Sequence, residues 1–216
     1  MNFELARFNM IQQQIRTWEV LDTRVLDLCA QVHREDFVPS AYRQLAFADT
    51  EIPLAHDEVM MTPKVEARLL QALQIQSGES VLEIGTGSGY LTALLGHLAA
   101  QVTSVDIHAE FTAAASHALM GAGVNNVRLE TGNGAFGWGT AEYDVIVITG
   151  SLPAIGGEWT RQLRAGGRLF AILGDAPIME ATLLTQVAKG QYTTEGLFET
   201  VIPPLRGVPI QTKFVL

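Results

Sequence analysis

Residues 80–95 read SVLEIGTGSGYLTALL, and this stretch decides the fold of the chain. The short apolar run at 81–84, interrupted by one acid at Glu83, is typical of a buried strand, and three glycines follow it at alternate positions, Gly85, Gly87 and Gly89. Apolar residues beyond the glycines recur at helical spacing, which predicts that a helix begins there. A strand, a glycine-rich loop and a helix in this order predict a binding turn of the nucleotide type. Glycines let backbone amides approach a ligand, and the helix N-terminus is partly positive.

The spacing within the loop distinguishes between ligands. A dinucleotide-binding loop needs a small residue at the sixth position counted from Gly85, but Tyr90 stands there. The pattern that begins at Glu83, E-x-G-x-G-x-G, resembles motif I of class I S-adenosylmethionine (SAM)-dependent methyltransferases. Such enzymes carry an acid at the end of the next strand to hold the ribose, and Asp106 ends the predicted strand at 102–106. An ordinary glycine-rich turn is the alternative, and the flanking strand and helix favour the cofactor site.

Composition describes a globular protein of 216 residues, with 48% hydrophobic and 17% charged residues. The net charge of −9 and the lack of a basic cluster argue against a nucleic-acid partner. The single cysteine, Cys29, is expected to be a buried thiol, since its neighbours are apolar. The N-terminal residues lack a signal-peptide pattern, and no apolar run reaches membrane-spanning length. We expect a cytoplasmic protein, either a monomer or a weak dimer, with no membrane partner.

Alternating strand and helix patterns predict an α/β fold with a doubly wound, mostly parallel, seven-stranded sheet. Residues 1–77 are expected to form an N-terminal helical cap with the substrate loop. Residues 78–216 are expected to form the cofactor-binding domain, and the two to make a single compact unit. Beyond the first strand, further strands are predicted at 102–106, 126–131, 143–149 and 168–173, with two or three more around 181–188, 195–202 and 210–216. The stretch 143–149 is apolar on both faces, as a central parallel strand should be.

Helix signals complete this outline. Residues 2–17 are predicted to form an amphipathic helix, and Asp22 is a candidate N-cap for a second one. Pro63 suits the first turn of a third helix. A short helix is expected at 159–163, followed by a turn at Gly166 and Gly167, while residues 40–62 are expected to be ordered loop with short elements.

A series of motifs runs along nearly the whole chain. Its members are MIQQQIR at 10–16, RVL at 24–26, HREDFVP at 33–39, AFADT at 46–50, IPL at 52–54, VLEIGTGSGY at 81–90, GNG at 132–134, GW at 137–138, YD at 143–144, QL at 162–163 and GGRL at 166–169. The order of these motifs resembles the protein-L-isoaspartate O-methyltransferase family. Motif I is shared by many methyltransferases, whereas the N-terminal segments are far more specific to this family.

The resemblance implies SAM as the cofactor, with S-adenosyl-L-homocysteine as the product. It assigns cofactor binding to Glu83, Gly85, Thr86, Gly87, Ser88, Gly89, Asp106, Ile107, Gly132, Asn133 and Gly134. Asp106 would accept the ribose hydroxyls, and Glu83 would support the loop or the ligand amine. Asn133 stands where the family has an aspartate that contacts adenine; its amide oxygen can accept the same hydrogen bond without a charge. An ordinary turn is the alternative for 132–134.

The acceptor loop departs from the family pattern. That pattern reads I-G-x-G-Q-T-I-S-x-P, whereas residues 54–63 read LAHDEVMMTP. Met61 stands at the position of the serine linked to catalysis and cannot donate a hydrogen bond, and Glu58 would repel a carboxylate. The nearest hydroxyl is Thr62, which either turns into the site or caps the helix that follows; a threonine before a helix-initial proline favours the cap. His56 is expected to line the acceptor pocket.

The chemistry tolerates such a change, because an ionised carboxylate needs no general base and methyl transfer depends on positioning and electrostatics. No metal site is expected, since the five histidines lack ligand spacing. Three hypotheses remain. The first is a SAM-dependent carboxyl O-methyltransferase that acts on isoaspartyl residues of damaged proteins or peptides. The second is a methyltransferase with another acceptor, either a small molecule or a different protein site. The third is a degenerate SAM-binding module that acts through protein contacts.

Overall fold

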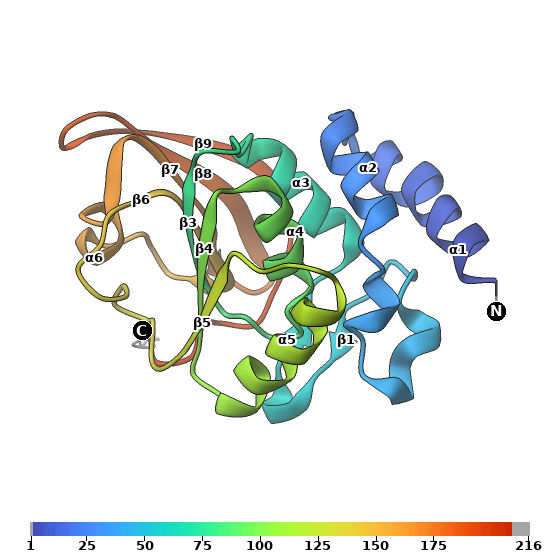
Figure 1. Ribbon diagram of the computed structural model, residues 1–216. Helices are drawn as coiled ribbons and strands as arrows, with labels where there is room; N and C mark the ends of the chain where they lie inside the picture. Colours follow the sequence, from blue (N-terminus) through green and yellow to red (C-terminus); the bar gives the residue numbers. More distant parts are fainter. Residues whose placement is uncertain (1, 209–216) are drawn as a thin grey trace, which may run out of the picture.

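A seven-stranded sheet lies at the centre of the computed structural model, which describes residues 2–208 (Figure 1). The strand order is β5-β4-β3-β6-β7-β8-β9. The first five of these strands pair in parallel, and β8 and β9 are antiparallel, which confirms the predicted mostly parallel sheet. The strands are β3 (Ser80–Ile84), β4 (Gln101–Asp106), β5 (Val127–Thr131), β6 (Tyr143–Leu152), β7 (Leu163–Asp175), β8 (Ile178–Ala188) and β9 (Gln191–Glu199).

The turn predicted at Gly166 and Gly167 is wrong, because β7 begins earlier and contains both glycines. The pairing between β6 and β7 is irregular here and jumps from Leu163 to Arg168, so the glycines occupy a bulge rather than a chain reversal. Gly166 has a φ of +79°, which explains why glycine is used there. The possible strand at 210–216 lies outside the described residues.

Helices cover both faces of the sheet unequally. Figure 1 shows α3, α4 and α5 on one face and the short α6 on the other, with α1 and α2 packed outside α3. Their bounds are α1 (Phe3–Met10), α2 (Thr23–Gln31), α3 (Pro63–Leu73), α4 (Tyr90–Leu98), α5 (Ala109–Gly121) and α6 (Gly157–Thr160). The predicted helix at 2–17 is α1 continued by a π-helical turn (Ile11–Ile15) and a 3-10 turn (Arg16–Trp18). Asp22 caps α2 by accepting a hydrogen bond from the Arg24 N–H, as predicted.

The core has two layers, one on each face of the sheet. Strand β6 shows the division, because Val145 and Val147 belong to the larger cluster and Ile146 and Ile148 to the smaller one beneath α6. The larger cluster also contains buried side chains of α1 and α2, so the N-terminal segment shares its core with the sheet. Cys29 lies in this core, and burial raises the pKa of its thiol to about 12. Among residues 2–208, no helix is both long enough and apolar enough to cross a membrane.

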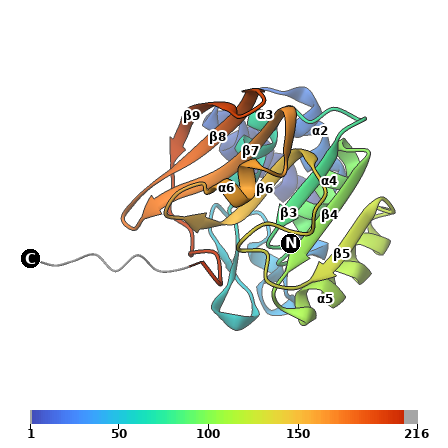
Figure 2. The same cartoon turned by 90° about the vertical axis from the view of Figure 1, so that its left-hand side faces the viewer.

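Two segments lie over the carboxyl ends of the parallel strands. The first is a small hairpin of β1 (Ile52–Pro53) and β2 (Val59–Met60), with a 3-10 turn (Ala55–Asp57) at its tip. The second is the chain after β9, which runs back across the sheet toward this hairpin (Figure 2). In open α/β sheets, ligands bind outside the carboxyl ends of the strands. The two segments therefore form the walls of a site.

Candidate functional site

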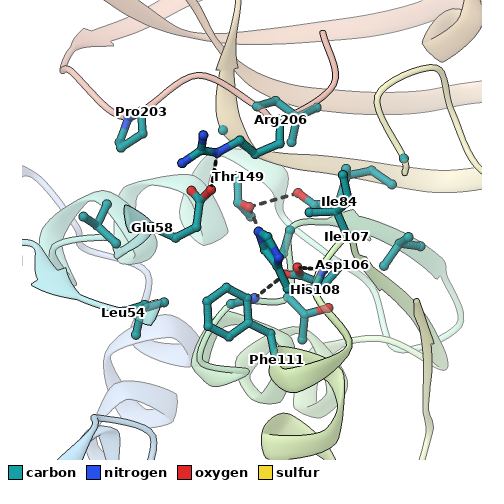
Figure 3. Close-up of a pocket in the computed structure, with 18 of the residues that line it drawn as sticks. Leu54, Glu58, Ile84, Asp106, Ile107, His108, Phe111, Thr149, Pro203 and Arg206 are labelled. Atoms are coloured by element: carbon teal, nitrogen blue, oxygen red, sulfur yellow. Dashed lines mark hydrogen bonds and ion pairs between the residues drawn. The ribbon is translucent and has the colours of Figure 1, made fainter. Parts of the chain in front are cut away.

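One pocket lies at this edge of the sheet, between the hairpin and the segment after β9 (Figure 3). It encloses about 890 Å³ of space between the atoms, part of it open to solvent. Its walls come from residues within 54–61, 84–88, 105–111, 132–135, 149–150 and 202–206, together with Glu66 and Leu91. Segments far apart in sequence thus meet at a single cavity.

The glycine loop forms the floor of the pocket. Gly85 has a φ of +99°, and a Cβ atom there would lie 2.0 Å from the Thr149 hydroxyl oxygen. That hydroxyl is 2.9 Å from the carbonyl oxygens of both Ile84 and Gly85, so it ties the end of β3 to β6. Gly87 also has a positive φ, +50°. Glycine fits both backbone conformations without strain, and Gly85 and Gly87 leave the backbone of the loop open to a ligand.

Asp106 connects this cradle to the end of β4. One carboxylate oxygen accepts a hydrogen bond from the Gly87 N–H at 2.9 Å, and the other accepts one from the His108 N–H at 2.9 Å. Each oxygen keeps a lone pair, because a carboxylate has about four acceptor positions. Asp106 can therefore hold the loop and still accept two hydroxyl hydrogen bonds from a ribose.

Glu83 lies beneath the loop rather than in the pocket. One of its oxygens accepts hydrogen bonds from the hydroxyls of Thr92 and Ser104, both at 2.6 Å. The Ser104 hydroxyl in turn is 2.6 Å from that of Thr86, which lines the pocket. Burial raises the pKa of Glu83 to about 8, so the carboxyl is mainly protonated at neutral pH. Glu83 supports the loop from below.

All the predicted cofactor residues except Glu83 and Gly89 line the pocket. Gly89 is needed for packing, since a Cβ atom there would lie 2.9 Å from the Cβ of Ala115 in α5. Asn133 is at the pocket wall, and its side-chain oxygen accepts a hydrogen bond from the Ala135 N–H at 2.9 Å. This is the turn contact that asparagine commonly makes, and the oxygen retains one lone pair. The open cradle, Asp106 and Asn133 fit a nucleoside with a flexible polar tail, as in SAM.

The acceptor side has methionine where the family pattern has a hydroxyl. Met61 is buried and lines the pocket. Thr62 does not line it, and its hydroxyl oxygen is buried without a hydrogen-bond partner among the described residues. The expected helix cap is wrong as well, because the Thr62 side chain makes no hydrogen bond to the N-terminus of α3. Its backbone carbonyl accepts from Val65 and Glu66 instead, so α3 begins without a side-chain cap.

His56 is turned toward α5 and is not among the lining residues. Its ring stacks on that of His108, with centroids 3.9 Å apart, and its Nε2 lies 3.3 Å from a carboxylate oxygen of Glu110. His108 lines the pocket in its place. The three side chains bring ligand atoms within 4.8 Å of one another, a set that could hold a metal ion. Sequence spacing could not reveal it, because His56 comes from the hairpin and the other two from the start of α5.

Met61 is held in place by a buried ion pair. The Arg34 guanidinium donates to the Met61 carbonyl at 2.6 Å and to the Glu66 carboxylate, and it lies 4.8 Å above the ring of Tyr90. Burial raises the pKa of Glu66 to about 7 even with Arg34 beside it. This network fixes the end of the hairpin against α3 and α4.

Arg206, to which no sequence pattern points, lines the pocket from the segment after β9. Its Nε donates to a carboxylate oxygen of Glu58 at 2.6 Å, and an Nη donates to the His56 carbonyl at 3.0 Å. Figure 3 shows this ion pair at the pocket mouth. The surrounding sequence, PPLRGVP, has no helical or strand periodicity, so only the tertiary fold brings Arg206 to the hairpin.

Comparison with known proteins identifies the family. The family model of Protein-L-isoaspartate(D-aspartate) O-methyltransferase (PCMT) matches residues 6–202. The chain belongs to this family. The family member Protein-L-isoaspartate O-methyltransferase 1 of Rhodopseudomonas palustris is 36% identical over 95% of this chain and 85% of its own length. The Koribacter versatilis protein-L-isoaspartate O-methyltransferase is also 36% identical, over 95% of this chain and 92% of its own.

Solved structures show the same fold. A candidate protein-L-isoaspartate O-methyltransferase from Plasmodium falciparum, in complex with S-adenosyl-L-homocysteine, superposes with a TM-score of 0.79 at 15% identity and covers 95% of this chain and 99% of its own. A second structure, a protein-L-isoaspartate O-methyltransferase, gives a TM-score of 0.78 at 22% identity and covers 92% of this chain and 65% of its own. At these identities the likeness concerns the fold, and the PCMT fold is the fold of this chain.

Proposed function

We propose that the protein transfers a methyl group from SAM to the carboxylate of an isoaspartyl residue in a damaged protein or peptide. One observation carries the proposal. A single pocket joins the open glycine cradle and Asp106 to the hairpin at 54–61, the segment at which the family pattern has its substrate loop. The relatives at 36% identity bear the name of this activity, which supports the same acceptor.

The reaction requires little from the protein beyond positioning the methyl donor and the acceptor carboxylate. SAM, when bound, supplies an electrophilic methyl group on a sulfonium. A carboxylate oxygen would form the new O–CH₃ bond as the S–CH₃ bond broke, and the electron pair of that bond would stay on sulfur in the neutral thioether of S-adenosyl-L-homocysteine. No proton moves, so the pocket needs no general base. Asp106 and the loop amides would hold the cofactor, while the hairpin would fix the acceptor.

Met61 motivates a second candidate, a methyltransferase with a different acceptor. Its side chain forms part of the pocket wall at the position of the family serine, and a thioether contacts apolar groups more readily than carboxylates. A small molecule or another protein site with an apolar surround would suit this wall. The isoaspartyl reaction is preferred because the rest of the chain follows the family pattern.

The two candidates are separated by the methyl acceptor. Purified protein would be incubated with methyl-labelled SAM and an isoaspartyl peptide, with the same sequence containing normal aspartate as the control. We expect label in a base-labile ester, released as volatile methanol, from the isoaspartyl peptide alone. Label that enters an extract protein or metabolite but neither peptide would support the second candidate. Binding of SAM without transfer to any acceptor would favour a degenerate binding module.

We also propose the class of acceptor, the cellular location and the oligomeric state. A peptide or protein acceptor, a cytoplasmic location and a monomer or weak dimer would all suit repair of intracellular proteins. The division into a cap of 1–77 and a cofactor domain of 78–216 is likewise proposed as a functional one, in which the cap carries the acceptor loop.

A further inference from the structure

The charges around the pocket are unevenly distributed. Among the described residues that line it, Arg206 is the only arginine or lysine, whereas Glu58, Glu66 and Asp106 are acidic. Glu66 is paired with Arg34, and Asp106 accepts backbone hydrogen bonds from the glycine loop and the residue after β4. A carboxylate that enters the acceptor side therefore meets one fixed positive charge, on Arg206.

The backbone near Arg206 is held firmly in place. The Ser151 N–H donates to the Pro203 carbonyl at 2.9 Å, and the Leu205 N–H donates back to the Ser151 carbonyl at 3.0 Å. The approach is close enough that a Cβ atom on Gly150 would lie 2.7 Å from the Leu205 Cα. These contacts fasten the segment to the end of β6, and they place the Arg206 side chain over the pocket mouth (Figure 3).

The partner of Arg206 is itself a carboxylate, and the contact is open to water. The Arg206 side chain is 52% exposed and that of Glu58 is 21% exposed. Solvent screening makes such a pair weak, so another carboxylate can compete with it. A guanidinium has five N–H donors, and the contacts to Glu58 and to the His56 carbonyl use two. The arginine can thus receive a second carboxylate without first losing every hydrogen bond.

The acceptor side needs such a donor. The Met61 side chain offers no N–H or O–H group, and the hydroxyl of Thr62 is buried outside the pocket. Arginine binds carboxylates with short, charge-assisted hydrogen bonds in a fixed geometry. One oxygen held in this way leaves the other free to face the methyl group.

We propose that Arg206 binds the acceptor carboxylate. The substrate carboxylate takes the place of the Glu58 carboxylate on the guanidinium. The inference rests on the proposed function and names the residue that recognises its substrate. In this chain, an arginine after β9 would replace the hydroxyl that the family pattern places on the hairpin.

Binding of a peptide to the protein saturated with S-adenosyl-L-homocysteine tests the role of Arg206 without methyl transfer. Calorimetry would compare an isoaspartyl peptide with the same peptide carrying the side-chain amide in place of the carboxylate. The wild type is expected to bind the carboxylate peptide about tenfold or more tightly than the amide. Arg206→Met should remove this preference. Glu58→Gln should strengthen carboxylate binding several-fold, and the double variant should bind as weakly as Arg206→Met.

Controls distinguish the loss of carboxylate binding from damage to the fold. Arg128→Met removes an exposed arginine that pairs with Glu130 on β5, away from the pocket, and should leave peptide binding unchanged. Affinity for S-adenosyl-L-homocysteine should be the same in every variant. A carboxylate preference that survives in Arg206→Met would overturn the inference, as would a wild type that binds neither peptide. Weaker carboxylate binding by Glu58→Gln would also overturn the inference, because the ion pair would then only hold the hairpin to the segment after β9.

The two proposals fail in different ways. A wild type that prefers the carboxylate peptide but transfers no methyl group to it would contradict the isoaspartyl activity and leave Arg206 as a carboxylate site. A wild type that methylates the peptide, with a KM unchanged by Arg206→Met, would contradict the role of Arg206 and leave the activity in place.

Discussion

The backbone N–H of Gly87 donates a 2.9 Å hydrogen bond to the carboxylate of Asp106, and this contact joins the glycine loop to the end of β4. Asp106 holds its second contact, with the His108 N–H, at the start of the segment that leads into α5. A single carboxylate therefore positions two walls of the pocket. The groups that would bind a cofactor are in place because this residue organises them.

Replacing Asp106 with alanine should weaken SAM binding about tenfold or more. The change removes the expected ribose acceptor and two backbone contacts, and hydrogen bonds to charged groups each contribute roughly 1.5–3 kcal/mol. Calorimetry with S-adenosyl-L-homocysteine measures the effect. Asp27→Ala, on the exposed side of α2, is the matched control. Equal affinity in wild type and Asp106→Ala would show that the cofactor does not contact this carboxylate.

Gly85→Ala should abolish cofactor binding and lower stability. The added Cβ atom would meet the Thr149 hydroxyl, and the residue's φ of +99° is strained for any side chain. Gly78→Ala is the control, because its Cβ has no neighbour within 4 Å. Thermal unfolding and calorimetry should show a large loss of stability and of cofactor affinity for Gly85→Ala. Both quantities should change little for Gly78→Ala. A Gly85→Ala protein that binds the cofactor normally would rule out this view of the loop.

Thr62→Val should retain methyl transfer and be at least as stable as the wild type. Its hydroxyl is buried without a partner among the described residues, and such a group costs roughly 1–3 kcal/mol. Valine keeps the shape and removes that cost. Steady-state kinetics and denaturant unfolding provide the measurement. A loss of kcat with unchanged stability would instead place the hydroxyl in the reaction.

The free energy of unfolding should depend on pH through Glu83. Its pKa is raised from 4.5 to about 8 in the folded protein, so the folded state binds a proton more tightly than the unfolded state. Stability from this group is complete below pH 4.5 and is lost as the pH rises toward 8, by at most about 1.4 kcal/mol per pH unit. Glu83→Gln should remove this component. Unfolding curves of both proteins at several pH values test it, and parallel pH profiles would contradict it.

The elements formed by neighbouring residues could be predicted from the sequence. The turn at 80–95 combines a strand, a glycine loop and a helix in one continuous stretch, and the structure reproduces all three. Asp106 was also predictable, because the end of a parallel strand next to that turn faces the same edge of the sheet. The bulge in β7 was not, since two glycines indicate a turn equally well and the pairing with β6 decides between them.

The acceptor side depends on tertiary contacts that no local pattern encodes. Arg206 meets Glu58 only because the chain after β9 returns to β6. Thr62 neither lines the pocket nor caps α3 with its hydroxyl, although the proline after it predicted a cap. His56 stacks on His108, and its backbone has a φ of +59°, a conformation that the residue type alone does not predict.

Methyl transfer itself tests the account most directly. Purified protein would receive methyl-labelled SAM and an isoaspartyl peptide, and both the peptide and S-adenosyl-L-homocysteine would be followed by mass spectrometry. We predict that S-adenosyl-L-homocysteine forms only when the peptide is present and that the methyl group is found as an ester on the isoaspartyl carboxyl. No transfer, or equal transfer to the normal aspartyl peptide, would contradict the account.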